Sequence, residues 1–195
     1  MPETISEAIG ADHKSIDAYA ENLKSAKDDA EKVRWRNLLT WTLARHAISE
    51  ELTLYPAMEQ WLGEEGVNLV KTDTEQHQGM KVYLAQVQDM TPTDPKFEPL
   101  LDTLMDVVHH HVEHESEVDM PRLEGLIPRE ESERIARQFQ WTKNIVPSRS
   151  HPAAPTEYYV ENLAALFLTP MDKLRDWLKD YPTQGDYDRA SNDAK

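Results

Sequence analysis

The residues best suited to chemistry gather between positions 107 and 121, where histidines and glutamates are packed into one short run. Taking about 100° per residue of a helix, His111 and Glu115 fall near the centre of an apolar face. The other histidines of the run are placed less favourably: His110 and His114 lie on the flank, and His109 points away. Burying an imidazole and a carboxylate is costly unless both are paired or coordinate a metal. The run therefore predicts a buried ion-pair or metal site centred on His111 and Glu115.

The His-x-x-x-Glu pattern occurs a second time, at His46 and Glu50. These two residues lie in the middle of a stripe with spacings of three and four, made of Trp35, Leu39, Leu43, His46, Glu50, Leu54, Ala57 and Trp61. His46 precedes Pro56 by ten residues, and His111 precedes Pro121 by ten. This weak internal repeat is consistent with two helix-hairpin halves.

Two further histidines lie on apolar helix faces. His13 falls between Ile9 and Ile16, and His77 falls in the middle of a face made of Val70, Met80, Leu84 and Val87. In a bundle whose helices alternate in direction, each histidine can be placed by counting residues to the nearest turns. At 1.5 Å per residue, the counts on the two sides of each turn differ by a length of only about 5 to 6 Å. The histidines of all four helices can therefore meet at one height.

A single buried histidine is ordinarily a hydrogen-bonded core residue, but four at one level with two buried carboxylates favour a metal site. Imidazole and carboxylate ligands suit iron, manganese or zinc, and two carboxylates able to bridge favour a dinuclear centre. The zinc-protease pattern His-Glu-x-x-His and the ferritin-like pattern Glu-x-x-His are both absent from the sequence. Glu51 is expected at the surface, because it points away from the stripe that holds Glu50.

The elements that must position these residues are helices. Glycine is scarce and strand-like alternation is lacking, so we expect an all-α fold, an up-down-up-down four-helix bundle. The predicted helices cover residues 4–25, about 30–62 and 65–90, and a fourth ends between 121 and 128, with a loop at 91–95. Residues 1–128 would form the bundle domain, and 129–185 a helical extension packed on it. Within that extension we expect a helix at 129–146, a tether at 147–155 and a helix at 157–181. Residues 186–195 are expected to be a disordered tail.

Composition narrows the classes of function. The chain has 195 residues and a formal net charge of -15, which disfavours binding to nucleic acid. It has no cysteine, so any metal must be held by nitrogen and oxygen ligands. No apolar run is long enough to span a membrane and the N-terminus lacks a signal-peptide pattern, so a cytoplasmic location is the default expectation.

The arrangement of these residues resembles a known family. The segments Asp12-His13, 46–56 (HAISEELTLYP), Glu75-Gln76-His77 and 111–115 (HVEHE) are similar to the His/His-x-x-x-Glu/His/His-x-x-x-Glu signature of hemerythrin-like, or HHE cation-binding, domains. The resemblance covers about residues 1–128 and implies a four-helix bundle with a non-haem di-iron centre that reacts with O2 or its relatives. By position it implies terminal ligands at His13, His46, His77 and His111, and bridging carboxylates at Glu50 and Glu115.

The chain departs from the oxygen-carrying members in one respect. Those members place a second histidine on the third helix, one turn from the first, whereas here Asp73 and Lys81 occupy those positions. Asp73, His110, His114, Glu117 or water are the candidates to complete the site. An open coordination position favours reactivity over reversible carriage. We therefore expect a di-iron protein that binds or reacts with O2, NO or peroxide. The alternatives are an oxidase, oxygenase or catalase-like enzyme with a small organic substrate and, less favoured, an iron-storage or structural metal protein.

Overall fold

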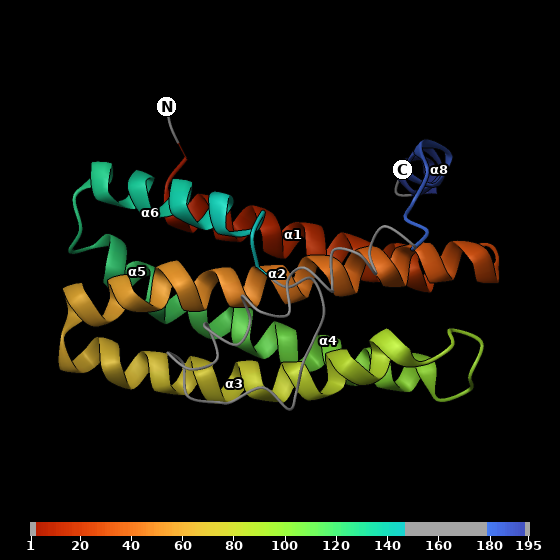
Figure 1. Cartoon of the computed structure of the whole chain (residues 1–195), viewed down its shortest axis with the longest axis horizontal. Coiled ribbons are helices and arrows are strands. Elements are labelled where there is room, and N and C mark those ends of the chain that lie inside the picture. The colour runs from red at the N-terminus through yellow and green to blue at the C-terminus, as the bar shows by residue number, and fades with distance from the viewer. Residues whose placement is uncertain (1–2, 147–178, 194–195) are drawn as a thin grey trace.

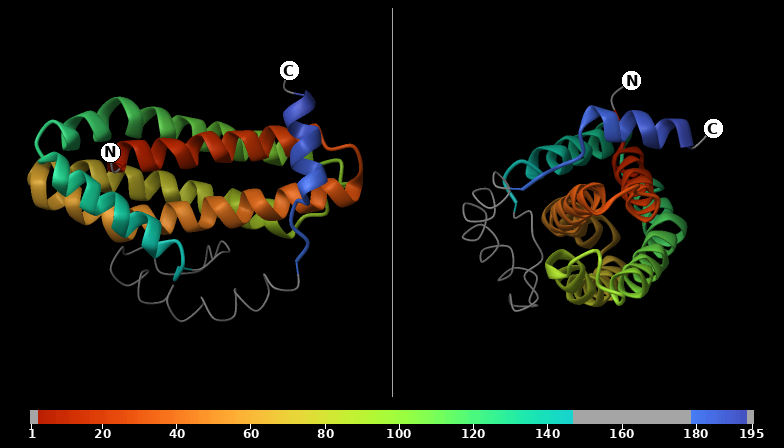
Figure 2. Two further views of the ribbon diagram at one scale, coloured as in Figure 1. Left: turned by 90° about the horizontal axis from the view of Figure 1, so that it is seen from above. Right: turned by 90° about the vertical axis from the view of Figure 1, so that its right-hand side faces the viewer.

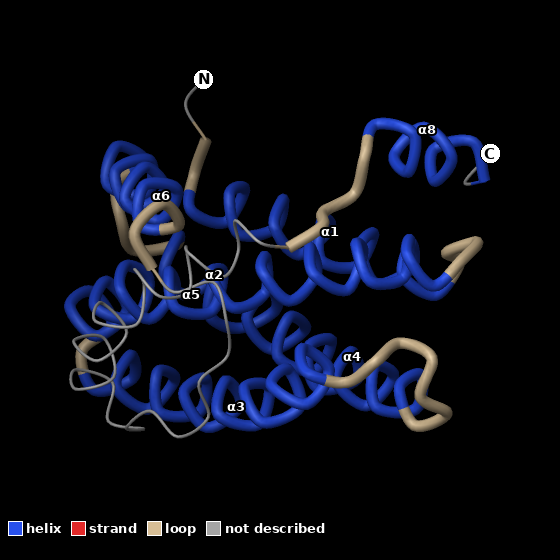
Figure 3. The backbone as a smooth tube through the Cα atoms, turned by 45° about the vertical axis from the view of Figure 1, so that its right-hand side comes forward, coloured by secondary structure: helices blue, strands red, loops and turns tan. Residues whose placement is uncertain are grey.

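Four long helices form the bundle that the sequence predicts. The computed structural model describes residues 3–146 and 179–193, and within these ranges it contains helices and loops but no strand (Figure 3). The bundle consists of α1 (Ile5–Lys24), α2 (Asp29–Leu62), α3 (Glu64–Asp89) and α4 (Phe97–His114), and seen end-on the four helices surround a common axis (Figures 1 and 2). None of the described helices is both long and apolar enough to cross a membrane.

The ends of the helices follow from local chemistry. Thr4 caps α1 in a reciprocal capping box with Glu7, and Asp28 caps α2 through the backbone of Glu31. The reversal from α2 to α3 occurs at Gly63, whose φ of 61° lies in the left-handed region. A Cβ on Gly66 would lie 2.1 Å from the carbonyl oxygen of Met58, so only glycine lets the two helices approach this closely.

The apolar core of the bundle is divided into two clusters. One contains Ile16, Leu39, Leu43, Met80, Leu84, Leu104 and Val108 among others, and the second contains Ile5, Ile9, Leu54, Val70 and Met120 among others. Between them, in all four helices, the sequence places histidines and glutamates instead of apolar residues. The buried polar layer thus crosses the bundle near its middle, at the level that the residue counts predict. Trp61, predicted on the inner stripe, lies in the last turn of α2 and is 37% exposed.

The fourth helix is less regular than predicted. After α4, residues Glu115–Asp119 form a turn of π-helix, followed by α5 (Met120–Glu124). The backbone N–H of Met120 donates to the carbonyl of Glu115, five residues earlier. Pro121 has no N–H to donate and its ring clashes with the carbonyl four residues back, which disfavours an ordinary α-turn here. Such widened turns are frequent at functional sites.

The C-terminal region adds two described helices. α6 (Arg129–Thr142) packs against α1 and α2 through the buried side chains of Ile135 and Phe139 (Figure 1). The expected tether and most of the expected helix at 157–181 lie outside the described residues. Residues 186–193, which belong to the tail expected to be disordered, lie in the helix α8 (Gln184–Asp193), which docks by ion pairs of Asp186 with Arg34 and of Arg189 with Glu31. A polar composition hides such pairing, because the partners are distant in the sequence.

Candidate metal centre

The structure brings all six predicted site residues into the polar layer. His13, His46, Glu50, His77, His111 and Glu115 are each at most 6% exposed. α1 supplies one histidine, α2 a histidine and a glutamate, α3 one histidine, and α4 with the π-turn a histidine and a glutamate. The four histidines face the inside of the bundle at one level, as helix phase and residue counts predict.

Glu50 joins two pairs of histidines. On one side, Nε2 of His46 lies 2.9 Å from Oε1 of Glu50 and 3.1 Å from Nε2 of His13. On the other side, Nε2 of His77 lies 3.3 Å from Oε2 of Glu50 and 3.2 Å from Nε2 of His111. Each pair with its Glu50 oxygen forms a group whose potential ligand atoms lie within 4.8 Å of one another. One carboxylate thus presents one oxygen to each of two neighbouring ligand groups.

The surroundings of the glutamate oxygens in the layer are those of metal ligands rather than those of hydrogen-bonded core residues. Oε2 of Glu115 lies 3.3 Å from Nε2 of His13. Yet neither oxygen of Glu50 or of Glu115 has a hydrogen-bond partner of good geometry among the described residues. Four orphaned carboxylate oxygens in a buried layer are costly, whereas cations between them and the imidazoles would satisfy all four. The donor set of imidazole nitrogens and carboxylate oxygens suits iron, manganese or zinc.

The electrostatics of the layer are uneven. Burial works to lower the pKa of His46, but Glu50 above all raises it to about 9. Burial and the neighbouring His46 lower the pKa of His13 to about 3. The second pair divides in the same way, with the pKa of His77 at about 9 and that of His111 at about 4. Burial and the negative charge of Glu50 raise the pKa of Glu115 well above its usual value. His46 and His77 thus carry the positive charge next to Glu50, a role that metal cations can take over.

Three of the four imidazoles are held by partners on their outer nitrogen. Nδ1 of His46 lies 3.3 Å from Asp12, which Lys143, the residue directly after α6, contacts at 2.8 Å. Nδ1 of His111 lies 2.8 Å from the amide oxygen of Gln76. Such contacts fix the tautomer and orientation of an imidazole and leave Nε2 for the metal.

Glu51 is the outer partner of His77, and the prediction that it lies at the surface is wrong. It is 1% exposed, its Oε1 lies 2.9 Å from Nδ1 of His77, and Lys81 neutralises it at 3.3 Å. The prediction failed because it treated α2 as buried along one stripe, whereas α1, α3 and α6 all pack against this helix. Tyr55 was also missed: its hydroxyl lies 3.1 Å from Nε2 of His77.

The candidates for completing the site separate into two kinds. His110 and Glu117 are exposed, and His110 belongs to none of the groups of ligand-type residues found in the described part of the chain. Asp73 and His114 instead form a third group with Asp119, a residue that the sequence reasoning missed. Sequence reasoning that assumes a regular α-helix cannot reveal Asp119, because the side chain of Asp119 comes close to His114 only when the π-turn is present.

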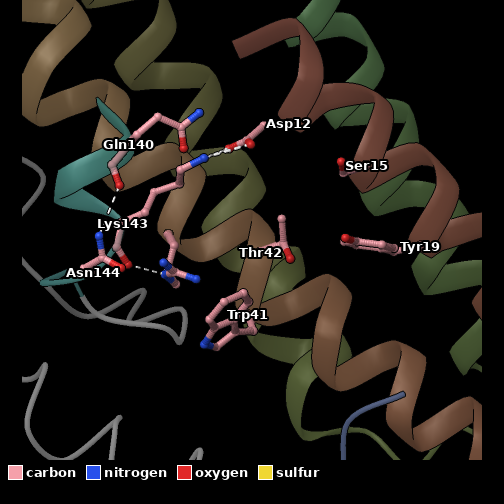
Figure 4. A pocket seen from close by; sticks show the side chains of 9 residues that line it. Asp12, Ser15, Tyr19, Trp41, Thr42, Gln140, Lys143 and Asn144 are labelled. Carbon is pink, nitrogen blue, oxygen red and sulfur yellow. Dashed lines mark hydrogen bonds and ion pairs between the residues drawn. The ribbon is translucent and has the colours of Figure 1, made fainter. Parts of the chain in front are cut away.

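A cavity of about 280 Å³ lies beside the outer face of the histidine layer. Its lining includes Asp12 and Tyr19 of α1, Trp41 and Arg45 of α2, and Lys143 close to the end of α6. Figure 4 shows Lys143 extended toward Asp12, the partner of His46. The cavity is therefore separated from His46 by one carboxylate.

The chain is similar to a known protein family and to two known proteins. Residues 4–123 match the family model described as the hemerythrin HHE cation binding domain. An uncharacterised hemerythrin-like protein of Schizosaccharomyces pombe is 41% identical over 178 residues, which cover 91% of this chain and 88% of that protein. A protein of a Nostoc species named DNA nickase is 24% identical over 145 residues, which cover 74% of this chain and 40% of that protein. No solved structure matches the chain.

Proposed function

The chain belongs to the hemerythrin HHE cation-binding domain family, and from that premise we propose that it holds a carboxylate-bridged pair of iron ions that binds or reacts with O2, NO or peroxide. The residues that would hold the pair are His13, His46, Glu50, His77, His111 and Glu115. When bound, the two ions would supply the electrons for reaction with a small oxidant.

The observation that carries this proposal is the position of Glu50. Its two oxygens face different histidine pairs, at 2.9 Å from His46 and 3.3 Å from His77, and neither has a hydrogen-bond partner in the described part of the chain. A carboxylate with this environment is suited to bridging two cations. Without cations, both oxygens of Glu50 would stay buried without a hydrogen bond, which is costly.

The surrounding side chains restrict what can reach the layer. Leu39, Leu43, Leu104 and Val108 are at most 2% exposed and form an apolar wall on one side, which limits the entry of water. On the other side, the hydroxyl of Tyr55 lies next to His77. Burial and the nearby carboxylates raise the pKa of Tyr55 well above its usual value, so the group stays protonated. It can therefore donate a hydrogen bond to a small oxygen-containing ligand at this position.

Anaerobic reconstitution with Fe(II) tests the proposal. We expect the loaded protein to contain a magnetically coupled iron pair and to change its optical spectrum on addition of O2, NO or peroxide. His46→Ala should lose the coupled pair, and His109→Ala, which changes an exposed histidine of α4, should keep it. A wild-type protein with fewer than one iron per chain after reconstitution, or equal losses in both variants, would overturn the proposal.

A second candidate is an enzyme proper, an oxidase, oxygenase or peroxide-decomposing protein. The cavity beside Asp12 favours it, because it offers room for a small organic molecule near His46 (Figure 4). Filling the cavity by Thr42→Phe should abolish turnover of such a substrate while leaving iron content and the reaction with O2 unchanged. If turnover survives this substitution, the cavity is not a substrate site.

The name of the Nostoc relative does not lead us to propose DNA cleavage for this chain. The chain spans 40% of that protein, so the named activity can reside in the part that is not shared. The formal net charge of -15 also opposes binding to the DNA backbone.

A further inference from the structure

Asp73, His114 and Asp119 form a second cluster of metal-ligating side chains, which we call the acidic group. They come from α3, the end of α4 and the π-turn. Nδ1 of His114 lies 3.4 Å from Oδ1 of Asp73 and 3.2 Å from Oδ2 of Asp119. None of the three belongs to the six residues of the iron pair.

The polar atoms of the acidic group are buried and lack partners. Asp73 is 1% exposed and Asp119 is 0% exposed. Within the described residues, Oδ1 of Asp73, both carboxylate oxygens of Asp119 and Nδ1 of His114 have no hydrogen-bond partner of acceptable geometry. Buried carboxylates are normally hydrogen-bonded, paired or bound to a metal. Here the short contacts to His114 have the distance of hydrogen bonds but not their direction.

The separations match those of ligands around a cation. With metal–ligand distances of about 2.0 to 2.2 Å, two ligands at octahedral or tetrahedral angles lie roughly 2.8 to 3.6 Å apart. The two contacts of His114, 3.2 and 3.4 Å, fall in this range. Two carboxylates and one imidazole also form a ligand set suited to Fe²⁺, Mn²⁺ or Zn²⁺.

The π-turn is what assembles this cluster. In an uninterrupted α-helix, the residue one turn after His114 would be Val118, and Asp119 would point elsewhere. The five-residue bond from Met120 to Glu115 inserts one additional residue into the turn. Asp119 then lies on the same side as His114, facing α3. The side chain of His114 is 26% exposed, so the cluster is reached from solvent at this residue.

We propose that Asp73, His114 and Asp119 bind a third divalent cation, separate from the iron pair. The three protein ligands hold the ion from one side, and its remaining positions face the solvent-accessible edge at His114. The proposal does not depend on the iron pair, because it rests on different residues. It assigns a role to Asp73 other than completing the histidine layer.

Zinc, which has no redox chemistry, is the probe that tests it. We expect metal analysis after equilibrium dialysis to give three Zn²⁺ per wild-type chain and two for Asp119→Asn, a substitution that keeps the shape of the side chain. Glu50→Ala, which affects both histidine groups, should retain one Zn²⁺. His110→Ala, an exposed neighbour of His114, should keep all three. His114→Gln is the second variant and should bind two Zn²⁺ per chain. If circular dichroism shows that Asp119→Asn has lost helical structure, the zinc count of His114→Gln is used in its place.

The outcomes separate the two proposals. If wild-type protein and Asp119→Asn bind equal amounts of zinc, the third site is wrong and the iron pair is unaffected. Where His114→Gln is used instead, a zinc count equal to that of wild type has the same meaning. One zinc in the wild-type chain and none in Asp119→Asn would support the third site and count against the pair.

Discussion

The histidine layer and the acidic group are built from the same helices but differ in how their ligands are supported. In the histidine layer, Asp12, Glu51 and Gln76 hold the outer nitrogens of three imidazoles, so the inner nitrogens are oriented without a metal. In the acidic group, the carboxylates of Asp73 and Asp119 have unpartnered oxygens among the described residues. The first site is preorganised, and the second depends on a cation to offset its charge.

The two sites also arise from different features of the helices. The histidine layer follows from regular α-helical spacing, with His and Glu four residues apart on two helices. The acidic group follows from an irregularity, the π-turn at Glu115–Asp119. Regular spacing gives a site that sequence periodicity reveals, whereas an irregular turn gives one that only the structure reveals.

The largest expected effect is that of Glu50→Ala on the histidine layer. Because Glu50 faces both histidine pairs, we expect loss of both ions of the layer, measured as a fall of two in the iron per chain after anaerobic reconstitution. Glu117→Ala, which changes an exposed glutamate two residues after Glu115, should retain both ions. Loss of only one ion in Glu50→Ala would show that the two halves of the layer bind independently.

Metal loading should stabilise the folded protein. For each site with free metal at about 100 times its Kd, binding adds about 2.7 kcal/mol to the free energy of unfolding. In a domain of this size that corresponds to a rise in Tm of roughly 5 to 10 °C per ion. Calorimetry with and without Zn²⁺ should show most of this rise missing in Glu50→Ala and a smaller part missing in Asp119→Asn. An unchanged Tm on loading wild-type protein would contradict both sites.

Loss of the support that Lys143 gives to the layer should have a smaller effect. Lys143→Met removes the ion pair that holds Asp12, the outer partner of His46. Changes to such outer partners typically weaken metal binding about 10- to 100-fold. We expect this loss for one of the two ions of the layer, measured by competition with a chelator. Asp17→Ala, which removes the exposed partner of His109, is the matched control and should leave the affinity unchanged.

Much of the bundle and of the histidine layer could be predicted because both depend on local periodicity. His13, His46, His77 and His111 stand where apolar residues are expected, and short turns fix their common height. Glu51 could not be placed, because its burial depends on how many helices surround α2. α8 could not be predicted, since Asp186 is held by Arg34, distant in the sequence. Asp119 could not be placed, because the position of the π-turn decides its direction.

The smallest effect distinguishes the two sites without any metal. Burial raises the pKa of Asp119 to about 6 from an ordinary value of 3.8. A carboxyl group with a raised pKa in the folded state destabilises that state when ionised. The penalty is absent below pH 3.8 and fully present above about pH 6. The shift from 3.8 to about 6 corresponds to a penalty of about 3 kcal/mol. Asp119→Asn removes this penalty but buries an amide at a cost of about 1 to 2 kcal/mol. In the presence of a chelator the variant should therefore be more stable than wild type by about 1 to 2 kcal/mol at pH 7.

Urea unfolding between pH 4 and pH 7.5 measures this difference, which should shrink as the pH falls. Asp17→Asn, an exposed carboxylate on α1, serves as the control and should show no such gain. With zinc bound the order should reverse, because wild-type protein then gains the third ion. If Asp119→Asn is less stable than wild type at every pH without metal, Asp119 is already stabilised by the protein. The contrast between a preorganised histidine layer and a cation-dependent acidic group would then be wrong.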